Sequence, residues 1–174
     1  MKKLIYPFVA IVLIFASAFT FIQSQDWKIE ENYSLKFDGG DPEGEFKGLK
    51  GLVRFDEKNL AASKFEVSIE VATINTGNGM KNTHAKSAGW FDAEKYPTIT
   101  FISLAITKTS SGYAAKGILD MHGIKKEITI PFTFSNNVFA SNFEVNRNEF
   151  GIGDPKHEKV PATLKLTISV PVTK

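Results

Sequence analysis

Apolar and polar residues alternate one by one along much of this chain, and this pattern restricts its fold more than any other feature. From Phe65 to Val71 the odd positions are apolar and the even positions are polar. Successive side chains of a β-strand point to opposite faces, so such a segment forms a strand with one buried and one wet face. Beyond the N-terminal segment, no long stretch has the 3.6-residue period of an amphipathic helix. The sequence therefore predicts an all-β domain.

Clusters of Gly, Asn, Asp and Pro divide the alternating stretches into eight predicted strands. Eight antiparallel strands in succession form either a sandwich with exposed edges or a closed up-and-down barrel, and alternation alone does not choose between them. Between Asn75 and Pro97 the alternation stops, and we expect a short helical excursion across one mouth of a barrel. The predicted strands cover residues 27–37, 44–55, 64–74, 98–107, 112–121, 126–134, 138–147 and 160–172.

The N-terminal segment has the pattern of a secretory signal peptide over residues 1–18, with cleavage there or a few residues later. Lys2 and Lys3 precede an apolar run, and Ala16-Ser17-Ala18 supplies the small residues of a cleavage site. The alternative is an uncleaved membrane anchor, because the apolar run continues to Ile22 and approaches the length of a spanning helix. Cleavage would give an exported, periplasmic protein.

Charge and cysteine content exclude several classes of protein. Removing Lys2 and Lys3 from the 21 Lys and Arg residues leaves 19, which balance the 19 Asp and Glu residues. A neutral domain gives no reason to expect a nucleic acid partner. The chain contains no cysteine, so disulfides, thiol catalysis and lipid attachment through cysteine are excluded. The hydrophobic core must provide the stability.

Four segments resemble the YceI-like family of periplasmic polyisoprenoid-binding proteins, and together they extend over most of the domain at 26–174. The family's first strand usually carries histidines that residues 31–40 lack, which bears on ligand identity more than on fold. The resemblance implies an eight-stranded antiparallel lipocalin-like barrel around an elongated cavity. It also implies a bound isoprenoid or other long-chain lipid, and a homodimer. The segments are 55–78, 84–101 (with Glu94-Lys95-Tyr96-Pro97 at its centre), 117–126 and 143–153.

Apolar positions of equal parity on the predicted strands define the inner face of such a barrel. An eight-stranded barrel is just wide enough to hold side chains or one small ligand, so part of this face packs and part lines a cavity. A lipid chain needs no catalytic groups to bind there, since each buried methylene contributes about 0.8 kcal/mol. The residues expected to contact ligand are Phe65, Val67, Ile69, Val71, Ile99, Phe101, Ile128, Ile130, Phe132, Phe134, Phe143, Val145, Leu164, Leu166 and Ile168.

Three polar residues within the motifs, His84, His122 and Arg147, are candidates for contact with a lipid head group. The guanidinium of Arg147 suits a carboxylate or phosphate. It equally suits a protein carboxylate that would pin a strand end. For both histidines the alternative is a structural hydrogen bond, which fixes the excursion in one case and a turn in the other.

Patterns of catalysis and of metal binding are missing from the sequence. It contains no Gly-x-Ser-x-Gly elbow, and its three histidines stand in different segments without the spacing of metal ligands. We therefore expect a lipid carrier without cofactor or metal, and not an enzyme. Two alternatives remain open: a small outer-membrane barrel with its apolar face outward, and an enzyme that uses Arg147 with His84 on an apolar substrate.

Overall fold

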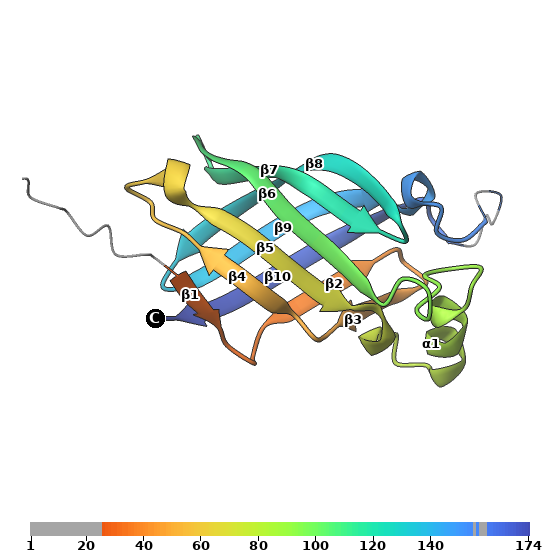
Figure 1. Cartoon of the computed structure of the whole chain (residues 1–174). Helices are drawn as coiled ribbons and strands as arrows, with labels where there is room; N and C mark the ends of the chain where they lie inside the picture. The colour runs from red at the N-terminus through yellow and green to blue at the C-terminus, as the bar shows by residue number, and fades with distance from the viewer. Residues whose placement is uncertain (1–25, 155, 157–159) are drawn as a thin grey trace, which may run out of the picture.

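The computed structural model describes residues 26–154, 156 and 160–174, so the predicted signal peptide lies outside the described residues. Within them the chain forms ten strand segments, one α-helix and three short 3₁₀-helices (Figure 1). The strands are β1 (Asp26–Ile29), β2 (Ser34–Asp38), β3 (Glu43–Phe46), β4 (Lys50–Arg54), β5 (Lys64–Glu70), β6 (Thr98–Thr109), β7 (Gly112–Met121), β8 (Ile124–Ser135), β9 (Val138–Asn146) and β10 (Thr163–Thr173). The helices are η1 (Leu60–Ala62), η2 (Val71–Thr73), α1 (Gly79–Lys86) and η3 (Arg147–Phe150).

The ten segments form a closed antiparallel barrel of eight strands, as the sequence predicts. β1 and β2 pair successively with β10, so they are two parts of one bent strand. β3 and β4 are likewise two parts of the next strand, because β3 pairs with β2 and β4 pairs with β1. From β4 the order runs through β5, β6, β7, β8 and β9 to β10. The pairs Asp26–Arg54 and Lys28–Thr173 then close the ring through β1.

Two predicted strands were wrong in their continuity. The strand expected at 27–37 is interrupted at 30–33, and the one expected at 44–55 is interrupted at 47–49. Gly48 has a φ of +72° there, a conformation that glycine adopts without strain. Glycine kinks commonly bend the strands of closed barrels. The strand expected at 64–74 also ends early, at Glu70, and its last residues form η2.

The predicted excursion is present as α1, at the end of the barrel opposite the C-terminus (Figure 1). The side chain of Asn78 caps the helix and accepts hydrogen bonds from the backbone N–H groups of Met80 (3.0 Å) and Lys81 (3.1 Å). No residue of the helix is buried. We call this end of the barrel the mouth.

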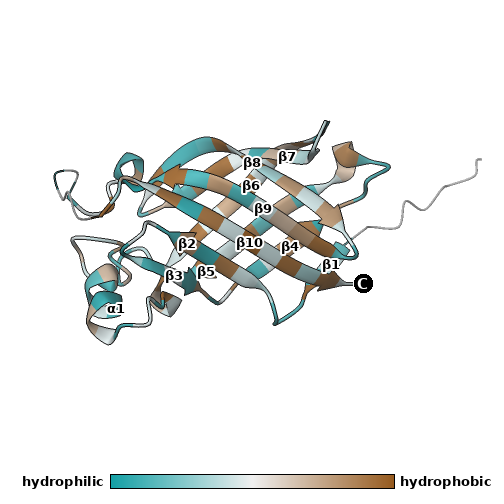
Figure 2. Cartoon of the chain, turned by 180° about the vertical axis from the view of Figure 1, so that it is seen from behind, coloured by the Kyte–Doolittle hydropathy of each residue, from teal (hydrophilic) through white to brown (hydrophobic). Residues whose placement is uncertain are grey.

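Apolar and polar residues alternate along the strands, as the banding of Figure 2 shows. Most of the apolar side chains are buried or partly buried, and Ile102 and Leu104 on β6 are exposed exceptions. On β10, Leu164, Leu166 and Ile168 are partly buried, whereas Lys165 and Thr167 are exposed. A transmembrane barrel has the opposite arrangement, with an apolar exterior. Among the described residues, no helix has the length and apolar character that crossing a bilayer requires.

An aromatic cluster, which we call the plug, fills the end of the barrel that carries the C-terminus. Phe55 lies at its centre with 1% of its surface exposed. Tyr113 and Phe134 meet it edge-on, with ring centroids at 5.0 and 5.2 Å. Trp27 packs on Phe134 and donates its Nε1–H to the carbonyl oxygen of Phe55 at 2.9 Å. The plug consists of Phe55, Phe65, Tyr113, Phe132, Phe134 and Phe139.

Truncation of the central ring is expected to destabilise the barrel strongly. Phe55→Ala should lower the free energy of unfolding by about 3–5 kcal/mol, because it removes buried contacts and leaves a void. Met80→Ala is the control, since Met80 is 83% exposed and its loss should change stability by about 0.5 kcal/mol or less. Urea denaturation followed by circular dichroism measures both. Equal losses would show that the plug does not support the fold.

Candidate functional site

A cavity of about 540 Å³ occupies the barrel between the plug and the mouth. Its walls come from eight strands, β2, β3 and β5 to β10, and from the segments that close the mouth. A second recess of about 140 Å³ shares Val67, Phe101 and Ile168 with it and is bounded by Phe132 and Phe139 of the plug. The apolar interior is therefore packed solid at one end and hollow at the other.

Most of the residues predicted by parity lie on these walls. Phe65 and Phe132 border the recess. Three predicted residues lie elsewhere: Val71 is buried in η2, Phe134 belongs to the plug, and Ile128 packs against the core beside the cavity. Parity fixes the face of a strand but not the depth along the barrel axis, which explains Phe134 and Ile128. Val71 differs because β5 ends at Glu70, before it. The predicted residues that line the cavity itself are Val67, Ile69, Ile99, Phe101, Ile130, Phe143, Val145, Leu164, Leu166 and Ile168.

Other wall residues were missed by the sequence reasoning. Leu35 and Phe37 on β2, and Leu119 and Met121 on β7, follow the same alternation and could have been included by the same rule. Residues from outside the strands could not, because no periodicity marks them. These are Ile74, Trp90, Phe91 and Ile152, which come from segments that fold over the mouth.

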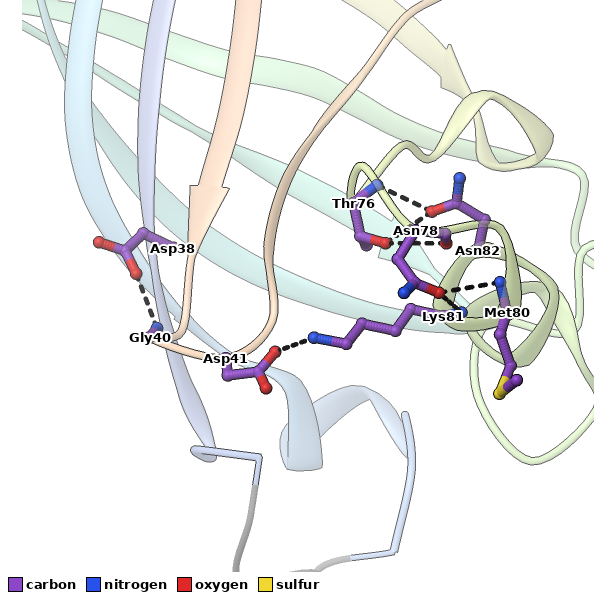
Figure 3. Close-up of polar contacts among 8 residues, drawn as sticks. All are labelled: Asp38, Gly40, Asp41, Thr76, Asn78, Met80, Lys81 and Asn82. Carbon is purple, nitrogen blue, oxygen red and sulfur yellow. Dashed lines mark hydrogen bonds and ion pairs between the residues drawn. The ribbon is translucent and has the colours of Figure 1, made fainter.

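The mouth is bridged by polar contacts between α1 and the turn that joins β2 to β3 (Figure 3). The ammonium of Lys81 forms an ion pair with the carboxylate of Asp41 on that turn. The turn itself is held by Asp38, whose carboxylate accepts a hydrogen bond from the backbone of Gly40 at 2.7 Å. These contacts hold a helix without buried side chains across the opening.

The N-terminal turn of α1 is fastened to the preceding loop by Asn82. Its side-chain oxygen accepts hydrogen bonds from the backbone N–H of Thr76 (2.8 Å) and from the hydroxyl of the same residue (2.7 Å). Figure 3 shows both contacts beside the Asn78 cap. The helix is therefore positioned by local polar contacts and by its ion pair with the β2–β3 turn.

Arg147 is buried at the mouth, with 2% of its surface exposed, and it organises the chain around it. Its guanidinium donates to the backbone carbonyls of Ile152 (2.6 Å), Val160 (2.9 Å) and Pro161 (3.0 Å). Within the described residues its hydrogen-bond acceptors are thus carbonyl oxygens, whereas the sequence also suggested a carboxylate. Burial lowers the pKa of Arg147, and the charge of Asp154 opposes this shift. The residue holds η3 to the start of β10 and also lines the cavity.

Trp90 brings the two candidate polar residues together. The guanidinium carbon of Arg147 lies 5.3 Å from the Trp90 ring centroid, and the His84 ring lies 5.4 Å from it. Gly153 packs so closely that an added Cβ would lie 2.8 Å from Nη1 of Arg147 and 3.0 Å from the Trp90 ring. A cation over an indole face is attracted by the ring quadrupole. Arg147, His84 and Trp90 thus form one polar corner of the mouth.

His122 has a structural position away from the cavity walls. It lies in the turn between β7 and β8 with a φ of +55°, followed by Gly123. Its Nδ1 is 3.1 Å from the carbonyl oxygen of Phe150, and its ring packs edge-on against Tyr96 at 4.8 Å. The residue therefore joins the β7–β8 turn to η3.

The site is an apolar cavity with a cationic rim, by which we mean the side chains of Lys81 and Arg147 at the mouth. Of the described residues that line the cavity, Asp41 is the only carboxylate, and it is paired with Lys81. The buried hydroxyls of Ser103 and Ser141 are engaged with backbone groups of neighbouring strands. The cavity can exclude water from an apolar chain and present positive charge at its opening.

The chain shows similarity to known proteins over most of its length. A family model for the YceI-like domain matches residues 19–172. A UPF0312 protein of Pseudomonas putida (strain GB-1) is 32% identical over 83% of this chain and 78% of its own length. Protein YceI of Escherichia coli O157:H7 is 34% identical over 50% of this chain and 46% of its own length.

Solved structures share the architecture. BcnA of Burkholderia cenocepacia matches with a TM-score of 0.77 and 25% identity, over 84% of this chain and 100% of that one. A polyisoprenoid binding domain from Saccharophagus degradans, implicated in plant cell wall breakdown, matches with a TM-score of 0.58 over 85% of this chain and 97% of that one. Its identity of 11% shows the fold alone.

Loss of the Arg147 guanidinium is expected to cost more stability than loss of an exposed arginine. Arg147→Met leaves several carbonyls without donors, and each buried unsatisfied group costs about 1–3 kcal/mol. Arg147→Lys should restore only part of the lost stability, because one ammonium does not reproduce the several donors of the planar guanidinium. Arg54→Met, which removes a surface ion pair with Asp26, is the control and should have a smaller effect. Urea denaturation compares the three, and a loss at Arg147 no larger than at Arg54 would contradict this role.

Proposed function

The chain belongs to the YceI-like family, and from this premise we propose that it binds a long apolar lipid of polyisoprenoid type inside its barrel. The observation that carries the proposal is the cavity of about 540 Å³ with almost entirely apolar walls. Ligand pockets commonly have volumes of about 300–1,000 Å³. A void of this size in a well-packed interior costs stability unless a ligand fills it.

The energetics of such a complex come from burial. Each methylene transferred from water contributes about 0.8 kcal/mol, so an isoprenoid chain gains affinity with every unit that enters the cavity. Because the plug closes the far end, the lipid chain can occupy only the space between the plug and the mouth. The apolar tail then points toward Phe65 and Phe132, and the head group stays near the mouth.

The cationic rim supports a polar or anionic head group at the mouth. The Arg147 guanidinium lines the cavity, and within the described residues it donates its hydrogen bonds to neutral carbonyls. His84 lies beside it on Trp90. A charged group in this position keeps its attraction for an anion, because the low-polarity surroundings screen it poorly.

We place the protein's role in carriage or storage of lipid in the periplasm. The predicted signal peptide over residues 1–18 supports export. A barrel that holds its ligand by burial needs no catalytic pair, so binding rather than turnover is the activity we assign. The name of the Saccharophagus degradans domain, which describes polyisoprenoid binding, agrees with this assignment.

Native mass spectrometry of the protein isolated without detergent, with organic extraction of any adduct, tests the proposal directly. The wild type should carry an apolar adduct. Ile69→Lys should lose it, because Ile69 lines the cavity and an unpaired ammonium is strongly disfavoured there. Ile102→Lys is the matched control, since Ile102 is 44% exposed on the outer face of β6.

The two variants separate loss of ligand from loss of fold. Circular dichroism establishes that each remains a barrel. Ile102→Lys should keep the adduct at the wild-type level. Wild-type protein that remains empty after incubation with geranylgeraniol, or an Ile69→Lys variant that binds as the wild type does, would refute the proposed function.

A further inference from the structure

The backbone ladder between β8 and β9 covers only a small part of these two strands. Among the described residues, pairing is restricted to Thr133–Ala140, Phe134–Phe139 and Ser135–Val138. By contrast, β8 pairs with β7 along its length from Ile124 to Phe132, and β9 pairs with β10 from Val138 to Asn146. The strands share a turn at the plug end and lose their pairing toward the mouth.

Pro131 explains where the ladder stops. In a two-residue hairpin, the residues next to the turn form a hydrogen-bonded pair, and such pairs alternate along the strands. Counted from Ser135–Val138, the next hydrogen-bonded positions are Thr133–Ala140 and then Pro131–Asn142. Proline has no N–H, so the third rung lacks its donor. The hydroxyl of Ser141 instead donates to the Pro131 carbonyl.

We call the unpaired edges of β8 (124–132) and β9 (141–146) the seam. At its mouth end the seam is bridged only by side chains in the described residues. The ammonium of Lys126 lies 3.1 Å from the carboxylate of Glu149, and His122 contacts the carbonyl of Phe150. An exposed ion pair of this kind contributes little to stability.

The seam separates the cavity from the outside. Ile130 of β8 and Phe143 and Val145 of β9 line the cavity, and they flank the seam on its inner side. Glu127 and Thr129 are exposed on the outer side. Along this stretch the two strands are joined by side chains, among them the Ser141 hydroxyl on the Pro131 carbonyl, without the backbone hydrogen bonds that hold the wall elsewhere. Separating the two strands there therefore breaks few interactions.

We propose that the lipid chain enters and leaves the cavity sideways through the seam. The proposal rests on the function proposed above. A lipid that entered at the mouth would have to pass α1, the Lys81–Asp41 ion pair and the packed Arg147–Trp90 corner. Through the seam it slides in along its whole length while its head group remains at the rim.

Restoration of the missing donor gives the first test. Pro131→Thr supplies an N–H at the third rung, and Pro131 is exposed, so threonine fits the strand. Extending the ladder by about two hydrogen bonds should slow uptake about tenfold or more. Pro171→Thr is the matched control: it also removes a strand proline, with the same gain in unfolded-chain entropy, but at the plug end of β10.

Uptake is followed by stopped-flow mixing with all-trans-retinol, a fluorescent isoprenoid, using energy transfer from tryptophan. Trp90 lines the cavity and serves as the donor nearest to the ligand. The amount bound at equilibrium should be the same in wild type and both variants. A Pro131→Thr rate equal to that of Pro171→Thr would count against the seam.

Cross-linking gives a second test that does not depend on the ladder reforming. Because the chain has no cysteine, a bifunctional thiol reagent reacts only at introduced pairs. Thr129→Cys with Glu144→Cys staples the seam, and Thr107→Cys with Ala114→Cys staples the paired strands β6 and β7 as a control. Asp41→Cys with Lys81→Cys staples the mouth.

The proposal expects the seam staple to slow uptake more than either other staple does. Greater slowing by the mouth staple, or equal slowing by the seam and control staples, would overturn the lateral route while the binding function stands. If the wild type takes up neither retinol nor geranylgeraniol, the proposed function fails and the seam proposal fails with it.

Discussion

Closure of the sheet through the short strand β1 is the constraint on which the remaining structure depends. Its four residues pair with β4 on one side and β10 on the other, which joins the first and last strands of the sheet. A closed sheet has no free edge strand, so its inner face is shielded from water, and the unpaired backbone of the seam lies within the wall. Only under that condition can a cavity with apolar walls remain dry and available to a lipid.

The two ends of the barrel use the same alternation for different purposes. At the plug end, aromatic rings converge on Phe55 and pack the lumen, apart from the small recess beside Phe132 and Phe139. Toward the mouth, the inward side chains leave a cavity, and polar groups from segments between the strands surround its opening. Stability and binding are thereby assigned to separate halves of one continuous interior. The partial ladder between β8 and β9 lies in the binding half, where a weaker wall does not reduce the stability that the plug provides.

Much of the fold follows from local rules, but the site depends on long-range geometry. Alternation predicted the strands, and His122-Gly123 and Asn136-Asn137 supply positive φ at the predicted turns. Parity identified the cavity face, yet it placed Phe134 and Ile128 on the cavity walls, because depth along the axis follows from the tilt and register of all strands together. The carbonyl partners of Arg147 come from a loop whose course no periodicity reveals. Pro131 was visible in the sequence, but its effect appears only once its neighbour on β9 is known.

The pairing of β1 with β10 also determines when the molecule can fold. The partners of Lys28 and Ile29 are Thr173 and Val172, so these contacts span nearly the whole chain. During synthesis the first strand has no β10 partner until the last strand has emerged. Contacts of such large sequence separation make folding slow, and they leave strand edges open to aggregation in the meantime. The strand edges of the nascent chain therefore stay open to aggregation until its synthesis is complete. A chaperone that binds unfolded chains would have its largest effect in this period.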